Sequence, residues 1–171
     1  GWSDHKTLWG FNDGFPQGFT PLQQAAEKYD SGLGVWLSPW GGYGGPKQKR
    51  IAYGKSKGYE TNRNGFSMAG PKYGAAFRDV CLTMMRDNGV VFFKFDGMGG
   101  GGGTGAAGEL ADDVDAVLDL TGELRKEDPD LFISATVGTW ASPFWTLYVD
   151  SVWRQGGDTG FYGPGNGRQR W

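Results

Sequence analysis

Two aspartates stand where the chain could carry out nucleophilic and acid–base chemistry. Asp96 follows the uncharged run 89–93, and Asp158 closes a later strand-like segment. A cation precedes each aspartate, Lys94 by two residues and Arg154 by four. Retaining glycosidases use two carboxyl groups about 5–5.5 Å apart, one as the nucleophile and one as the acid and base. The two aspartates therefore suggest glycoside hydrolysis.

The strand before Asp96 decides which way its side chain points. Residues 90–95 are typical of a strand buried on both faces of a parallel sheet, and such folds place chemistry at the carboxyl ends of their strands. Lys94 and Asp96 are two residues apart, so both face the same side. A nearby ammonium favours the ionised carboxylate, which suits a nucleophile. An ordinary salt bridge at the strand end is the alternative.

The second pair of charged residues also has a structural alternative. Asp158 follows two glycines, where an aspartate often serves only to form a turn. With Trp153 and Arg154 before it, we favour the role of acid and base. Arg154 would donate paired hydrogen bonds to sugar hydroxyls, or else bind Asp150 or Asp158.

The elements around these residues alternate between strand and helix. We expect helices at 21–29, 72–88 and 108–127, a short helix near 142–145, strands at 33–37, 90–95, 131–136 and 148–154, and a long loop at 46–70. Thr20 is the expected N-cap of the short helix at 21–29, and Gly89 is the expected stop of the helix at 72–88. This order predicts an α/β fold built from βα repeats. A complete (β/α)₈ barrel usually needs about 250 residues, so the 171 residues predict one partial barrel domain, 1–171, truncated at both ends.

Composition excludes several classes of protein. The net charge of −2 gives no basic surface for nucleic acid. No apolar run approaches the roughly 18 residues of a membrane span.

The single cysteine, Cys81, is expected to be a buried small side chain. The eight tryptophans serve either as core or as flat surfaces for sugar rings. Of these, Trp40 and Trp140 at strand exits are the expected sugar platforms, and Trp36 within a strand is expected in the core.

Two further segments resemble ligand-binding motifs, and for both we favour a purely structural interpretation. The glycine-rich run 97–105 lies between a strand and a helix, as a phosphate-binding loop would. It lacks the Gly-Lys-Ser/Thr ending, and a rim loop is the preferred interpretation. The acidic group Asp112, Asp113 and Asp115 lacks the pattern of a calcium loop. We expect a solvated helix start there, and no metal site.

Four short motifs share a family likeness across nearly the whole chain. They are Gly1-Trp2, Phe15-Pro16-Gln17-Gly18-Phe19 followed by Leu22, Lys94-Phe95-Asp96-Gly97, and Trp153-Arg154-Gln155-Gly156-Gly157-Asp158. In this order they resemble elements of the catalytic barrel of clan D glycoside hydrolases, the α-galactosidases and α-N-acetylgalactosaminidases (melibiases).

The resemblance implies a fold, an activity and a set of site residues. The chain would span roughly strands 3 to 6 of the barrel. It would hydrolyse terminal α-galactosyl or α-N-acetylgalactosaminyl bonds with retention, with Asp96 as nucleophile and Asp158 as acid and base. Substrate contacts would come from four side chains, Lys94, Arg154, Trp40 and Trp140. No cofactor is implied, the partner is a carbohydrate, and a secreted or periplasmic location is implied. Oligomeric state is left open.

The sequence also departs from the family pattern. The two aspartates that precede Gly-Trp in the family do not occur in this sequence. On the fifth strand, the segment 135–140 replaces the usual Cys-x-x-Gly or Ser-Gly-Gly element. The choice between galactose and N-acetylgalactosamine therefore stays open.

Two other classes of function remain. One is a non-catalytic, carbohydrate-binding relative of the barrel, of the kind sometimes labelled enterotoxin. The other is a nucleotide-binding α/β protein that uses the glycine run. The 171 residues alone are expected to be inactive and to self-associate, because part of a barrel leaves open sheet edges.

Overall fold

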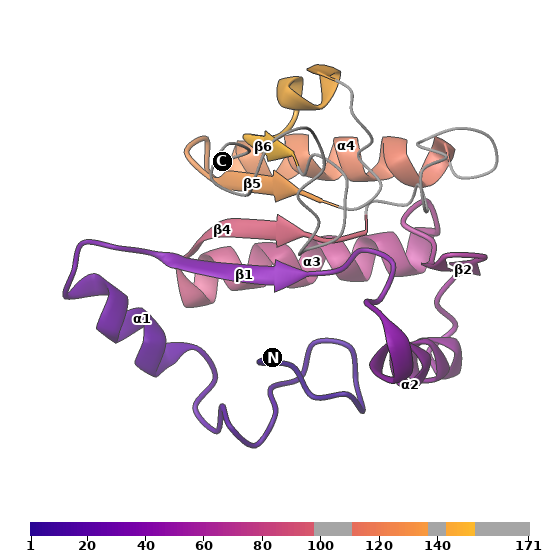
Figure 1. The fold of residues 1–171 in the computed structure, drawn as a ribbon, viewed down its shortest axis with the longest axis horizontal. Helices are drawn as coiled ribbons and strands as arrows, with labels where there is room; N and C mark the ends of the chain where they lie inside the picture. Colours follow the sequence, from indigo (N-terminus) through magenta and orange to yellow (C-terminus); the bar gives the residue numbers. More distant parts are fainter. Residues whose placement is uncertain (98–110, 137–142, 153–171) are drawn as a thin grey trace, which may run out of the picture.

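The centre of the molecule is a four-stranded parallel sheet. The computed structural model describes residues 1–97, 111–136 and 143–152, and the structural statements below concern these residues. The strand order is β1-β4-β5-β6, and all three pairings are parallel (Figure 1). The strands are β1 (Leu33–Leu37), β4 (Val90–Phe95), β5 (Phe132–Ala135) and β6 (Ser151–Val152).

Helices and one small hairpin surround this sheet. The helices are α1 (Thr20–Glu27), α2 (Gly44–Ser56), α3 (Pro71–Asn88), α4 (Ala111–Glu127) and the 3-10 helix η2 (Pro143–Leu147). The antiparallel hairpin consists of β2 (Thr61–Asn62) and β3 (Gly65–Phe66). Figure 1 shows α1 near the amino end of β1, and α2 with the hairpin beyond the carboxyl ends of the strands.

One face of the sheet is the hydrophobic core, and we call it the covered face. Alternate residues of the three longer strands are 0–4% exposed there: Val35, Leu37, Phe93, Phe95, Ile133 and Ala135. Helices α3 and α4 pack on it. The ring of Phe77 from α3 lies 5.8 Å from that of Phe95, and Val117 of α4 is fully buried. This burial, worth about 1.5–3 kcal/mol for each large apolar side chain, holds the sheet and helices together.

Several of the residues that alternate with these along the same strands form what we call the open face. Gly34, Trp36, Phe92, Lys94 and Ser134 belong to it, and Asp96 continues it beyond the end of β4. All are half-buried except Gly34, which is exposed. The register aligns Trp36 with Lys94 and Lys94 with Ser134. Because side chains alternate along a strand, the polar and aromatic groups of this row share one side of the sheet.

Most of the predicted elements are confirmed. The strands at 33–37 and 90–95 have the expected bounds, and α3 begins one residue before the predicted 72. Gly89 ends α3 in the left-handed conformation, with φ of 60°, as expected for a glycine stop. The N-cap prediction was wrong, because Thr20 is the first residue of α1 and Phe19 occupies the cap position without a side-chain hydrogen bond. Residues 108–110 and 153–154 of the predicted elements lie outside the described residues.

The long loop predicted at 46–70 was wrong. Most of this segment is helix α2 and the β2–β3 hairpin. The buried residues of α2 are Arg50 and Gly54, and its apolar Ile51 and Tyr53 are only partly buried against the core. Gly54 allows the helix to lie directly on the hairpin, because a Cβ at this position would overlap the ring of Phe66. Tertiary packing thus stabilises a helix that has little hydrophobic pattern of its own.

The solvated helix start predicted for the acidic group was wrong at one position. Asp113 is only 4% exposed. Its carboxylate accepts hydrogen bonds from Asn62 Nδ2 (2.7 Å), Ser67 Oγ (2.7 Å) and the backbone N–H of Ala69 (3.1 Å). A buried carboxylate is tolerated where it is this fully hydrogen-bonded. Asp113 therefore fastens α4 to the hairpin, whereas Asp112 and Asp115 are exposed as expected.

The sheet and helices form an open α/β arc, as expected for part of a barrel. Four parallel strands with helices on one face do not close on themselves within the described residues. Among those residues, no helix has the length and apolar character needed to cross a membrane.

Candidate active site

Asp96 lies directly after β4, at the carboxyl end of a central strand. Its backbone N–H donates to Leu37 O (2.9 Å), which extends the pairing with β1 by one residue. Gly97 follows with φ of 91°, a conformation that suits glycine. The pairing with β1 therefore ends at Asp96, and alternation puts its carboxylate on the open face with Lys94. This is the placement that the sequence predicted for a nucleophile.

Two side chains from different elements hold the carboxylate. Trp36 Nε1–H, from β1, donates to Asp96 Oδ2 (3.0 Å). The Tyr43 hydroxyl, from the turn before α2, donates to Asp96 Oδ1 (2.6 Å). Hydrogen bonds to a carboxylate are roughly twice as strong as those between neutral groups. With one donor on each oxygen, the orientation of the carboxylate is fixed relative to β1 and to this turn.

Sequence reasoning missed both of these partners. Trp36 was expected in the core, but it is half-buried on the open face and bonded to Asp96. The sequence did contain a signal for this placement. In the paired strands Trp36 is aligned with Lys94, so its side chain points to the same face as those of Lys94 and Asp96. Tyr43 gave no such signal, because its approach to Asp96 depends on the path of the turn between β1 and α2.

Lys94 shares the open face without a described ionic partner. It is half-buried, and its Cα lies between those of Trp36 and Ser134 in the sheet register. Within the described parts of the chain, it forms no ion pair. The alternative of an ordinary salt bridge between Lys94 and Asp96 is thus not seen there, and a role in substrate binding stays a prediction.

Trp40 does not offer a flat surface to a sugar, which corrects the expected platform role. Its side chain is 6% exposed. The indole packs against Gly97, where a Cβ would overlap the ring, and Lys47 Nζ lies 5.0 Å from the ring centre. The indole N–H is buried without an acceptor among the described residues. Trp40 therefore shapes the turn after Asp96 from inside the protein.

The turn that carries Tyr43 is built on Arg50. Gly41 and Gly42 have φ values of 100° and 91°, and the Gly42 N–H donates to Ser38 Oγ (2.9 Å). Arg50, on α2, donates from Nη1 to Gly41 O (3.2 Å). Burial lowers the pKa of the Arg50 guanidinium, and this effect exceeds the opposing attraction of Tyr73 and Asp4. Sequence analysis missed this residue because it assigned the segment to a loop.

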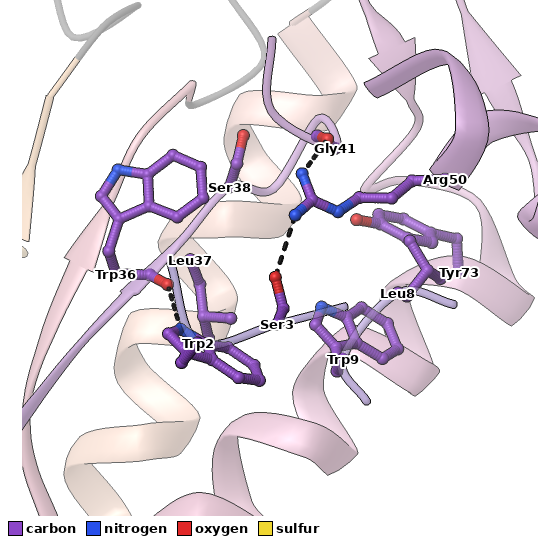
Figure 2. A pocket seen from close by; sticks show the side chains of 10 residues that line it. All are labelled: Trp2, Ser3, Leu8, Trp9, Trp36, Leu37, Ser38, Gly41, Arg50 and Tyr73. Carbon is purple, nitrogen blue, oxygen red and sulfur yellow. Dashed lines mark hydrogen bonds between the residues drawn. The ribbon is translucent and has the colours of Figure 1, made fainter. Parts of the chain in front are cut away.

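A small pocket lies beside this turn. Its volume is about 20 Å³, and Figure 2 shows the side chains of Trp2, Ser3, Trp36 and Arg50 around it. Trp36 therefore contacts the pocket as well as Asp96. A volume of this size holds about one water-sized particle, so the pocket cannot be a sugar-binding site.

Three of the predicted site residues lie outside the described residues. These are Asp158, Arg154 and Trp140, and the glycine run from residue 98 onward lies outside as well. In the described ranges, no group of three or more His, Cys, Asp or Glu side chains could hold a metal ion.

Comparisons with known proteins show a likeness in fold. The α-galactosidase of Lactobacillus brevis matches with a TM-score of 0.64 and 16% identity, over 90% of this chain and 24% of that one. The galactosidase domain of the α-galactosidase-sucrose kinase AgaSK matches with a TM-score of 0.60 and 18% identity, over 88% of this chain and 23% of that one. No family model and no curated protein matches the sequence.

These matches confirm the predicted fold class. The chain spans about a quarter of the length of either α-galactosidase structure, and it is a partial (β/α) barrel similar to theirs. At 16–18% identity, the likeness concerns the fold, and the chemistry has to be argued from the site residues.

Proposed function

We propose that this chain carries both catalytic aspartates of a retaining glycosidase that acts on terminal α-galactosyl or α-N-acetylgalactosaminyl residues, with Asp96 as the nucleophile and Asp158 as the acid and base. The observation that supports it most is the position of Asp96. Its carboxylate lies at the carboxyl end of a central parallel strand, and a separate donor holds each of its oxygens. In β/α barrels this end of the sheet is where catalytic residues lie. The fold likeness to α-galactosidases favours the same class of substrate.

The proposed reaction has two steps. An oxygen of Asp96 attacks the anomeric carbon while the bond to the leaving group breaks, and Asp158 gives the leaving oxygen its proton. Water then attacks the glycosyl-aspartate, Asp158 takes a proton from this water, and the Asp96 carboxylate is released. Configuration at the anomeric carbon is retained, because it is inverted twice.

The residues around Asp96 would hold it ready for attack. Hydrogen bonds from Trp36 and Tyr43 restrict rotation of the carboxylate, and an oriented nucleophile loses less entropy on reaching the transition state. Lys94 adds a positive charge on the same face. Arg154 and Trp140 are the proposed sugar contacts from elsewhere in the chain. The buried Trp40 would support the Asp96 turn without touching the substrate.

Replacement of Asp96 tests this proposal in the protein that contains the chain. Hydrolysis of nitrophenyl α-galactoside and its N-acetylgalactosaminide should fall on the order of 10⁴-fold or more in Asp96→Ala, as for loss of other catalytic nucleophiles. In Asp96→Gly, added azide should restore turnover and yield a glycosyl azide. Asp115→Ala, which removes an exposed carboxylate of α4, is the matched control and should retain full activity.

Two results would overturn the proposal. Unchanged turnover in Asp96→Ala would show that another residue is the nucleophile. If the unmodified protein binds galactosides but hydrolyses neither substrate, the non-catalytic carbohydrate-binding alternative would replace the enzyme.

A further inference from the structure

Arg50 is a buried cation that has only neutral partners among the described residues. It is 8% exposed. Its Nη1 donates to Gly41 O (3.2 Å) and its Nη2 to Ser3 Oγ (2.9 Å), while Nε is buried without an acceptor. No carboxylate of the described residues lies within ion-pair distance of it. A buried, unpaired charge is costly, so this guanidinium needs a counter-ion.

The one carboxylate that acts on Arg50 electrostatically among the described residues is engaged elsewhere. Asp4 attracts Arg50 from a distance, but its Oδ1 accepts three hydrogen bonds within its own turn. The donors are the backbone N–H groups of Lys6 (3.0 Å) and Thr7 (2.7 Å) and the Thr7 hydroxyl (2.9 Å). These bonds hold Asp4 where it does not pair with Arg50.

The pocket beside Arg50 is lined by hydrogen-bond donors. The Ser3 and Ser38 oxygens accept from Arg50 and from the Gly42 N–H, so each hydroxyl keeps its hydrogen for another acceptor. Neither hydroxyl donates to a described residue. The indole N–H of Trp9 also has no acceptor in the described part of the chain, and Figure 2 shows it on the side of the ring toward Ser3.

None of the described residues that line this pocket carries a carboxylate. Figure 2 shows the tip of the guanidinium directed into the space bounded by Ser3, Ser38 and Trp36. A water molecule in such a site would need acceptors as well as donors for its usual set of about three hydrogen bonds. An anion uses donors only, and it neutralises the guanidinium.

From this combination of charge, donors and size, we infer that the pocket binds one small monovalent anion, of the size of chloride. The ion would accept hydrogen bonds from Arg50, Ser3, Ser38 and Trp9. With about 20 Å³ available, there is room for roughly one water-sized particle, so sulfate and phosphate are excluded. Asp96 does not line this site, and the inference does not depend on the proposed glycosidase activity.

The test is direct halide binding to the protein that contains this chain. We expect excess ³⁵Cl NMR line width that bromide displaces, and a higher melting temperature in potassium chloride than in potassium gluconate at equal ionic strength. Sulfate should not displace the chloride. Arg50→Gln should abolish the excess line width. Trp9→Phe keeps a ring against Tyr73 and Phe77 but removes one donor, and should weaken binding several-fold.

The matched control is Trp145→Phe, which changes a buried tryptophan of η2 and should leave halide binding unchanged. Equal melting temperatures in chloride and gluconate, together with no excess line width, would overturn the inference. The same holds if folded Arg50→Gln binds chloride as the unmodified protein does. Should Arg50→Gln fail to fold, the comparison of Trp9→Phe with Trp145→Phe decides, and equal halide affinity in these two variants would overturn the site.

Discussion

The same strands form both faces of the parallel sheet, but one face packs into the core and the other carries the candidate site residues. On the covered face, alternate residues are 0–4% exposed and pack under α3 and α4. On the open face, Trp36, Phe92, Lys94, Ser134 and Asp96 are half-buried, and a hydrogen bond joins Trp36 to Asp96. A strand period of two thus lets one short segment such as 92–96 supply both core and candidate chemistry. The difference teaches that stability and activity should be separable by choosing neighbouring residues.

The largest separation is expected between Phe93 and Phe92. Phe93 is fully buried on the covered face and stacks on Phe95, with ring centres 5.4 Å apart. Phe93→Ala should therefore lower the free energy of unfolding by about 3–5 kcal/mol. Phe92 is half-buried and has an edge contact with Phe132 at 5.3 Å, so Phe92→Ala should cost only about 1 kcal/mol. Urea denaturation of both variants measures the difference.

The same two variants test whether the sheet really has one packed face and one face that carries the candidate chemistry. If Phe92→Ala is as destabilising as Phe93→Ala, the open face is a second core, and the division into a packed face and a chemical face is wrong. The urea midpoints of the two variants are comparable only if the free energy of unfolding depends on urea concentration with the same slope in both. A changed slope would indicate a change in the unfolded state, not lost packing.

The next largest expected effect on stability comes from Gly97, which follows Asp96 just beyond the end of β4. A Cβ at this position would overlap the Trp40 ring, and φ is 91°. Gly97→Ala combines overpacking with backbone strain and should cost about 2–4 kcal/mol. Gly122→Ala is the control, since a Cβ there meets nothing within 4 Å inside α4, and it should stabilise by about 0.5–1 kcal/mol. Thermal melts that rank the two variants in the opposite order would contradict the packing at Trp40.

The covered face could largely be predicted from the sequence, and the open face only in part. The apolar strands at 33–37 and 90–95 and the glycine stop at Gly89 are local signals, and the structure follows them. Asp96 could be placed because it directly follows a predicted strand. Trp36 shares its parity, yet an aromatic residue within a strand is equally typical of a core.

The remaining features depend on contacts between distant segments. Asp113 is buried because Asn62 and Ser67, 51 and 46 residues earlier, donate to it. Helix α2 forms although its buried residues are Arg50 and Gly54, neither of which reads as a core position. Such long-range pairings leave no periodic signal in a single sequence.

Removing one donor from Asp96 should lower activity. Tyr43→Phe and Trp36→Phe each delete a hydrogen bond to a charged group, a loss of about 1.5–3 kcal/mol. If the whole of this free energy stabilises the transition state, kcat/KM for nitrophenyl α-galactoside falls about 10–100-fold when the bond is removed. Tyr29→Phe, on an 83% exposed residue, is the control. Unchanged kcat/KM in both variants would mean that these bonds do not position a reacting carboxylate.

The smallest effect is a pH dependence of the helix that packs on the covered face. Glu60 accepts hydrogen bonds from the Tyr73 and Lys72 N–H groups at the start of α3, and the bond from Tyr73 is the main cause that lowers its pKa. Because the folded pKa lies below the unfolded value of 4.5, this stabilisation is present above pH 4.5 and is lost as pH falls through the folded pKa. The melting temperature of Glu60→Gln should therefore fall less below pH 4.5 than that of the parent or of Glu27→Gln. Equal slopes in all three would remove Glu60 as the source, and an effect of Glu60→Gln on the pH profile of turnover would mean that the two faces are coupled.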